Sequence, residues 1–321
     1  MIRFLAERLL QSLVVLLAMS FLIYLLIGLM PGDPVDILIM SNPNLTADDI
    51  VRMRAELRLD EPVHERWLAW LDRALAGDFG YSRVFAQPVP EVLGPRILAT
   101  LWLTGIAFLL AIAIAIPAGI LAATRPWSAT DYAINFVTFA GISIPPFWLA
   151  LLLIMLFSVT LNWLPAGGVP LDADAGALAW ARHLVLPVIT LTIPGVAGFT
   201  RYVRADMREA LRQDYIRTAR AKGAPERRVV LGHALRNAMI PVTTVIALDF
   251  GALFSGALIT ETMFAWPGMG KLIYDAIMGN DYNLALVGLL FATALILAGN
   301  LLADLVYGWL DPRIQVGGTE R

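Results

Sequence analysis

Six intervals of the chain are long enough and poor enough in charge to cross a lipid bilayer, and they constrain the fold more than any other feature. A bilayer core of about 30 Å is crossed by roughly 20 helical residues. The composition agrees, because 58% of the residues are hydrophobic and only 16% are charged. We therefore predict an all-α membrane protein, residues 1–321 forming a single transmembrane domain, with six helices at about 9–30, 97–124, 132–161, 184–205, 237–260 and 282–306.

The orientation follows from the uneven distribution of positive charge. Loops rich in Arg and Lys stay on the cytoplasmic side, and here they precede the first span, join the second to the third and the fourth to the fifth, and follow the sixth. The loop at 31–95 instead has eleven acidic residues against six arginines. Both termini are therefore predicted to be cytoplasmic, and 31–95 to be an extracytoplasmic insertion. Amphipathic patterns at 45–59 and 61–75 predict two short helices there, either a lid or a binding surface.

The densest positive charge lies between the fourth and fifth predicted spans. Residues 201–236 contain ten Arg and Lys against four acidic residues. Within this loop, 214–222 can form a helix, Gly223 suits the left-handed position that ends a helix, and Pro225 suits the start of the next. The segment is therefore predicted to be a helix–break–helix hairpin with its apolar side chains, such as Ile216, on one face.

Two explanations of this basic hairpin remain open. Attraction to anionic membrane lipid, worth about 1 kcal/mol per basic residue near the surface, is the simpler one. Lipid attraction does not require a sharply bent helical pair, however, so the bend favours docking into a cleft of a partner protein. Nucleic acid is disfavoured as a partner, because no aromatic residues are interleaved with the basic ones.

Several kinds of chemistry are excluded by residues that the chain lacks. It has no cysteine, and its three histidines lie far apart without ligand spacing, so no metal site is predicted. No G-x-x-x-x-G-K-[ST] motif is present to cradle a nucleotide phosphate. No catalytic residue and no bound cofactor are predicted, and any ATP-driven work must come from a partner.

Several motifs together resemble one family. RTARAKG at 217–223, GISIPPFWLALLL at 141–153, ETMFAWPGMGKLIYDAI at 261–277 and LLADLVYGWLDPRI at 301–314 are similar to ABC importer permeases of the dipeptide, oligopeptide and nickel transport family, in the B-type transmembrane subunit. The resemblance covers nearly the whole chain. It implies a type I ABC importer permease fold, in which 206–236 is the cytoplasmic coupling loop.

The coupling loop of that family, its EAA loop, implies a set of ATPase-coupling residues. Its Glu-Ala-Ala positions fall on Arg217, Thr218 and Ala219, of which only the second alanine is kept, and its glycine falls on Gly223. The implied coupling residues are Asp214, Tyr215, Arg217, Thr218, Ala219, Arg220, Ala221, Lys222, Gly223 and Ala224.

The resemblance also implies partners and a place in the cell. The chain would lie in the bacterial inner membrane as one half of a heterodimer with a second homologous permease. Two cytoplasmic ABC ATPase subunits would hydrolyse ATP with Mg, and a periplasmic binding protein would deliver di- or oligopeptides. Within the family, a nickel chelate, glutathione, an opine or a sugar is the alternative substrate. Outside it, a stand-alone secondary transporter or channel is the alternative, which would predict an inverted internal repeat.

Three further groups of residues carry hypotheses about transport. Asp249 lies halfway along the fifth span, where a charge costs roughly 2.5–3.5 kcal/mol. It is predicted to line the translocation path and attract a cationic group, the alternative being a hydrogen-bonded or protonated Asp at the interface with the partner permease. Pro145 and Pro146 break the third span and suit a helix that lines the path, or a kink for packing alone.

The third group follows the fifth span, at the outer face of the membrane. A periplasmic gate or a contact with the binding protein is predicted there, with aromatic anchoring at the membrane interface as the alternative. The residues of this predicted gate are Glu261, Phe264, Trp266, Pro267 and Gly268.

Overall fold

The structure is a computed structural model, which describes residues 2–29, 46, 61–170, 172, 175–252 and 257–310. The described chain is mostly helical, as predicted, and its strands are a two-residue antiparallel pair, β1 (Tyr81–Ser82) and β2 (Gln87–Pro88). The helices are α1 (Ile2–Gly28), α4 (Val63–Leu75), α5 (Val89–Thr124), α6 (Ala129–Ser143), α7 (Pro146–Leu153), α8 (Ala177–Ala210), α9 (Asp214–Ala221), α10 (Glu226–Arg228), α11 (Leu235–Ala252), α12 (Leu258–Met263), α13 (Met269–Met278) and α14 (Tyr282–Leu310), with π-helical segments η1 (Ile154–Thr160) and η2 (Val229–Ala234).

Five stretches of described helix are long and apolar enough to cross a membrane: Leu5–Gly28, Val89–Thr124, Ala177–Ala210, Glu226–Phe250 and Tyr282–Leu305. A sixth is reached if α6 and the α7–η1 segment count as one broken span. Length and composition therefore define a chain that crosses the membrane several times.

The third predicted span is not one straight helix. The axis bends by 100° between Ala129–Ser143 and Pro146–Thr160. Pro145 has extended backbone angles, and Pro146 begins α7. Two consecutive prolines explain the break, because each lacks a backbone N–H and disfavours helical angles at the residue before it. Pro187 and Pro194, by contrast, lie inside the continuous helix α8.

The described chain divides into two compact units. One contains Ile2–Ile97 and Leu272–Ala294, with α1, α4, the strands, and parts of α5, α13 and α14. In this unit the predicted helix at 61–75 is confirmed as α4, and the indole of Trp67 donates to the Ser20 hydroxyl of α1 at 3.2 Å. The other helix predicted in the insertion, at 45–59, lies outside the described residues except for Thr46.

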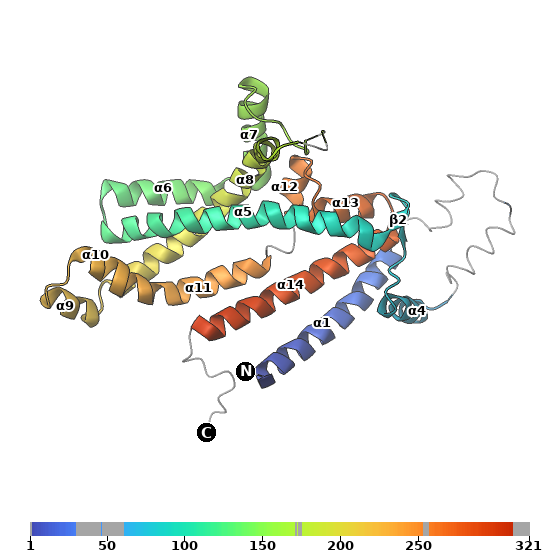
Figure 1. Ribbon diagram of the computed structural model, residues 1–321, viewed down its shortest axis with the longest axis horizontal. Coiled ribbons are helices and arrows are strands. Elements are labelled where there is room, and N and C mark those ends of the chain that lie inside the picture. The colour runs from blue at the N-terminus through green and yellow to red at the C-terminus, as the bar shows by residue number, and fades with distance from the viewer. Residues whose placement is uncertain are drawn as a thin grey trace. The chain divides into compact units, whose positions relative to one another are not determined.

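The second unit contains Leu98–Lys271 and the residues from Leu295 onward. Within it, α5, α6 and α8 run close together, and α11 packs on α8 (Figure 1). α5 and α8 approach so closely that a Cβ at Gly119 would lie 2.6 Å from the Val203 side chain. Only glycine allows that approach, because the Val203 side chain of α8 lies almost against the backbone of α5 at this position.

Candidate functional site

The predicted helical hairpin is present at one end of the second unit. α9 and α10 lie together just beyond the adjacent ends of α8 and α11 (Figure 1). Ile216 of α9 is fully buried and packs in a cluster with side chains from α5, α8, η2 and α11. The buried members of this cluster are Ala123, Val203, Met207, Ala210, Ile216, Val229, Ala234, Ala238 and Val242. The hairpin is therefore fixed on three long helices rather than hanging from a loop.

The bend of the hairpin has the geometry that its sequence predicts. Gly223 has φ +77°, the left-handed region that side chains rarely adopt. A Cβ placed there would meet no atom within 4 Å, so backbone conformation alone requires the glycine. Across the bend, Arg220 donates to both carboxylate oxygens of Glu226, at 3.1 and 2.6 Å. This bidentate bond raises the pKa of the Arg220 guanidinium above its ordinary value. It also joins the two arms of the hairpin.

The second arm differs from the regular helix that the sequence predicts. It begins as the short α10, continues through η2 as a π-helix and becomes α-helical again at Leu235. Val229 and Ala234, the first and last residues of η2, are both fully buried in the cluster around Ile216. π-helical segments occur frequently at functional sites.

Most of the predicted coupling residues form the outer surface of this hairpin. Eight of the ten are exposed, and Ala219 and Ala224 are half-buried. Arg217 pairs with Asp214 one turn earlier on the same surface. The exposed ones are Asp214, Tyr215, Arg217, Thr218, Arg220, Ala221, Lys222 and Gly223. The hairpin therefore has a buried apolar face, which packs on the long helices, and an exposed polar face. This arrangement suits an element that a partner contacts on its exposed face.

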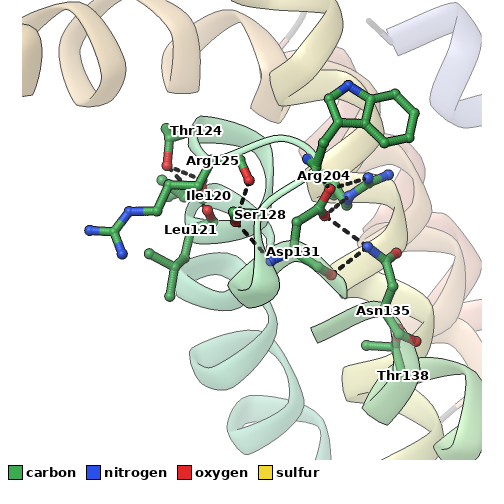
Figure 2. Close-up of polar contacts among 10 residues, drawn as sticks. Ile120, Leu121, Thr124, Arg125, Ser128, Asp131, Asn135, Thr138 and Arg204 are labelled. Atoms are coloured by element: carbon green, nitrogen blue, oxygen red, sulfur yellow. Dashed lines mark hydrogen bonds and ion pairs between the residues drawn. The ribbon is translucent and has the colours of Figure 1, made fainter. Parts of the chain in front are cut away.

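Close to the hairpin, the structure joins two residues that the sequence analysis does not single out. Arg204 of α8 donates through Nε to one oxygen of Asp131 at 2.6 Å and through Nη2 to the other at 2.8 Å (Figure 2). Asp131, in the first turn of α6, is 2% exposed. Asn135 donates to the same carboxylate at 2.8 Å. The Asp131 carboxylate therefore accepts hydrogen bonds both from α8 and from its own helix.

Asp131 also shapes the turn between α5 and α6. Its backbone N–H donates to the Ser128 hydroxyl at 3.2 Å, and its carboxylate accepts from the Trp127 N–H at 3.0 Å. This reciprocal pattern resembles a capping box, and the sequence S-x-x-D was the signal that could have located it. Its partner could not be found in the same way, because nothing local links position 131 to position 204. One turn beyond Arg204, Arg208 stacks over the Trp127 ring at 5.1 Å.

The predicted gate residues are mainly inside the protein. Glu261 is fully buried, Phe264 is 1% and Trp266 is 2% exposed, Gly268 is buried and Pro267 is half-buried. The two aromatic rings thus pack within their own unit and do not face outward as interface anchors. Their predicted role in a gate or a binding-protein contact stays a prediction.

Glu261, in α12, accepts the central hydrogen bonds of this buried segment. Its carboxylate accepts from the Thr100 hydroxyl of α5 at 2.5 Å and from the Lys271 N–H at 2.9 Å. Thr100 also accepts from the Met269 N–H at 2.8 Å, and the Trp266 indole donates to the Ala99 carbonyl at 3.0 Å. The residues from Glu261 to Lys271 are therefore bonded to one turn of α5.

The three residues predicted along the path are all exposed on the single chain: Asp249, Pro145 and Pro146. Among the described residues, none bonds the Asp249 carboxylate. No group of three or more acidic or histidine side chains that could hold a metal ion occurs in the described part of the chain either.

Fold and sites together define a helical membrane protein that crosses the bilayer several times and carries a bent helical hairpin on its α8 and α11 ends. The chain belongs to the family of inner membrane components of binding-protein-dependent transport systems, whose model matches residues 115–316. A second model, for the N-terminal part of such components, matches residues 1–94. The protein is thus an ABC importer permease of the peptide transport family, and the resemblance seen in the sequence is confirmed.

Curated relatives match the chain almost from end to end. The oligopeptide transport system permease protein AppB of Bacillus subtilis is 39% identical over 98% of this chain and 100% of the relative. A putative peptide permease protein of Brucella ovis is 42% identical over 98% of this chain and 100% of the relative. The glutathione transport system permease protein GsiC of Escherichia coli K12 is 37% identical over 98% of this chain and 99% of the relative. Among solved structures, a chain of the inward-facing MetNI methionine ABC transporter aligns with a TM-score of 0.49 and 18% identity, covering 68% of this chain and 96% of that one.

Proposed function

We propose that this chain is one of two permease subunits of an ATP-driven importer, and that its substrates are di- or oligopeptides. It would have six spans in a type I permease fold with both termini in the cytoplasm. A second, homologous permease, two ABC ATPases and a periplasmic binding protein would complete the transporter. The names of the similar proteins, which are peptide and glutathione permeases, support this class of substrate.

One observation carries the proposal: the bent hairpin exposes the predicted coupling residues while its Ile216 side chain is buried among transmembrane helices. An ATPase subunit bound to the exposed face of α9 would push on α5, α8 and α11 together. The chain itself has no phosphate-binding loop, so ATP and Mg would be bound by the partner alone.

Glutathione is the second candidate substrate, because one group of relatives is named for its transport. Both candidates are short peptides with a free ammonium group and carboxylates. Uptake of a labelled tripeptide in competition with glutathione and with unrelated peptides distinguishes the two. Displacement by glutathione alone would assign the chain to glutathione import, and displacement by many peptides would assign it to general peptide import.

The docking role is tested at Gly223, where only the backbone angle constrains the residue. Gly223→Val should leave membrane insertion intact but abolish ATP-dependent uptake, because a branched side chain disfavours φ +77° and would straighten the bend. Gly223→Asn is the matched control, since asparagine tolerates the left-handed region, and it should retain most of the uptake.

ATPase co-purification and peptide uptake, both measured on these variants, test the docking role. The ATPase subunits should co-purify with the wild-type chain and with Gly223→Asn, and be lost from Gly223→Val. Equal uptake by Gly223→Val and the wild type would remove the docking assignment. Uphill accumulation of peptide by the purified chain alone, in vesicles without ATPases, would overturn the proposed function as a whole.

A further inference from the structure

We propose that the ion pair between Asp131 and Arg204 is a positioning contact that makes α6 move with α8 when the ATPases act on α9. This inference rests on the proposed function of α9 as the ATPase docking element. It assigns to two residues outside the predicted coupling set a role in converting ATP hydrolysis into transport.

The last turns of α8 have two faces that contact different parts of the unit. On one face, Val203, Met207 and Ala210 pack in the buried cluster around Ile216 of α9. On the other, Arg204 binds Asp131, and Arg208, one turn later, stacks over Trp127. Residues four apart lie on the same side of a helix. The same eight residues of α8 therefore hold the hairpin on one side and the α5–α6 turn on the other.

The Asp131–Arg204 contact differs in kind from the packing around Ile216. Apolar contacts are non-directional, so packed helices can slide past one another by small steps. A guanidinium fork bonded to both carboxylate oxygens fixes distance and orientation together. Arg204 meets this geometry with bonds of 2.6 and 2.8 Å to a carboxylate that is 2% exposed (Figure 2). Rotation or translation of α8 in this region is thereby transmitted to the first turn of α6.

The far end of α6 leads directly into the bent span. α6 ends at Ser143, immediately before the break at 144–145, where the chain turns by 100° into α7. Pro145 and Pro146, which form this break, are the residues predicted to lie along the translocation path. A push on α9 would thus reach the bent span through α8, the Asp131–Arg204 pair and the fifteen residues of α6.

The test uses the complete transporter, reconstituted in vesicles with both permeases, the ATPases and the binding protein, and a labelled tripeptide as the probe. Asp131→Asn keeps the shape of the side chain and removes its charge, and Arg204→Lys keeps the charge and removes the fork. Arg125→Gln is the matched control, because Arg125 is an exposed arginine in the same turn whose side chain points away from Asp131 (Figure 2). The readout is peptide taken up per ATP hydrolysed, with ATPase co-purification and thermal stability measured on the same samples.

Both variants are expected to bind the ATPases and hydrolyse ATP, while uptake per ATP falls by about 2- to 30-fold, the range in which residues of a linking network change coupling. Arg125→Gln should match the wild type in all three measurements. A double variant, Asp131→Asn with Arg204→Lys, should be no worse than its worse single variant, because both changes remove one contact.

The outcomes separate this inference from the function on which it rests. If the ATPases do not bind the wild-type chain, the proposed function fails. If they bind, and Asp131→Asn transports as much peptide per ATP as Arg125→Gln, the positioning role is refuted while the proposed function stands. Loss of thermal stability with unchanged uptake per ATP in the surviving complex would make the pair a purely structural contact, and would refute the inference equally.

Discussion

Glu261 and Thr100 are joined by a 2.5 Å hydrogen bond between a fully buried carboxylate and the hydroxyl of a residue in α5. The other carboxylate oxygen accepts from the Lys271 N–H. A buried carboxylate is costly unless it is bonded on both oxygens, and here the bonds come from α5 and from the start of α13. Glu261 thereby ties α12 and the start of α13 to a membrane-spanning helix.

The first prediction concerns the removal of this carboxylate. Glu261→Ala should destabilise the protein by about 1–3 kcal/mol, because it leaves the Lys271 N–H and the Thr100 hydroxyl buried without their acceptor. Glu261→Gln should cost less, since one amide oxygen remains to accept. Thermal unfolding in detergent measures the difference. The exposed Glu65 in α4 provides the control through Glu65→Gln, and equal midpoints for Glu65→Gln and Glu261→Ala would contradict the structural role of Glu261.

The second prediction concerns the glycines that surround this carboxylate. A Cβ at Gly268 would lie 2.2 Å from the Glu261 carboxylate, a distance that no folded protein accommodates without movement. Gly268→Ala should therefore cost about 1–3 kcal/mol through overpacking. Gly105→Ala in α5 is the matched control, because a Cβ there would meet nothing within 4 Å, and it should stabilise the helix by about 0.5–1 kcal/mol. Opposite shifts of the unfolding midpoint are expected, and shifts of the same sign would count against this packing.

The sequence was sufficient for features that depend on local chemistry. The long apolar helices follow from runs of apolar residues. The bend of the hairpin follows from Gly223 and Pro225, which adopt the backbone angles that their residue types favour. The buried position of Ile216 follows from helical periodicity. In each case the residues that determine the feature lie within about ten positions of it, so the local sequence is enough to predict it.

Contacts between distant segments could not be predicted in this way. Asp131 and Arg204 are 73 residues apart, and Glu261 and Thr100 are 161 apart. Arg204 is one of ten basic residues at 201–236, and the sequence alone does not say which of their side chains is turned toward the protein interior. Phe264 and Trp266 lie near the end of a predicted span, where aromatic residues often anchor at the membrane interface, but tertiary packing buries both of them.

The third prediction tests the attachment of the hairpin to the membrane helices. Ile216→Ala removes most of a fully buried side chain and should destabilise the hairpin by about 2–5 kcal/mol. Leu231→Ala, in the second arm, is the control, because Leu231 is 45% exposed and its truncation should cost only about 0.5 kcal/mol. Hydrogen exchange of the amides in α9 reports the local effect. Protection of α9 should fall in Ile216→Ala and persist in Leu231→Ala, and unchanged protection in both would show that the buried cluster does not hold the hairpin.

The fourth prediction concerns Asp249, a carboxylate on an exposed face of α11 within an apolar stretch. An ionisable group at this depth is stable only when it faces a cavity or a partner. If it lies along the path and attracts the ammonium group of a peptide, Asp249→Asn should reduce uptake of a free tripeptide more than that of its N-acetylated form, whereas Asp249→Glu should keep the preference.

The alternative position of Asp249, at the interface with the second permease, predicts a different result for the same variant. Asp249→Asn would then change the yield of the assembled permease pair, and both peptides would be affected equally. Comparing uptake per assembled complex for the two peptides separates the cases, because assembly cancels from that ratio. An unchanged ratio of free to acetylated peptide would exclude recognition of the ammonium group by Asp249, whatever happens to total uptake.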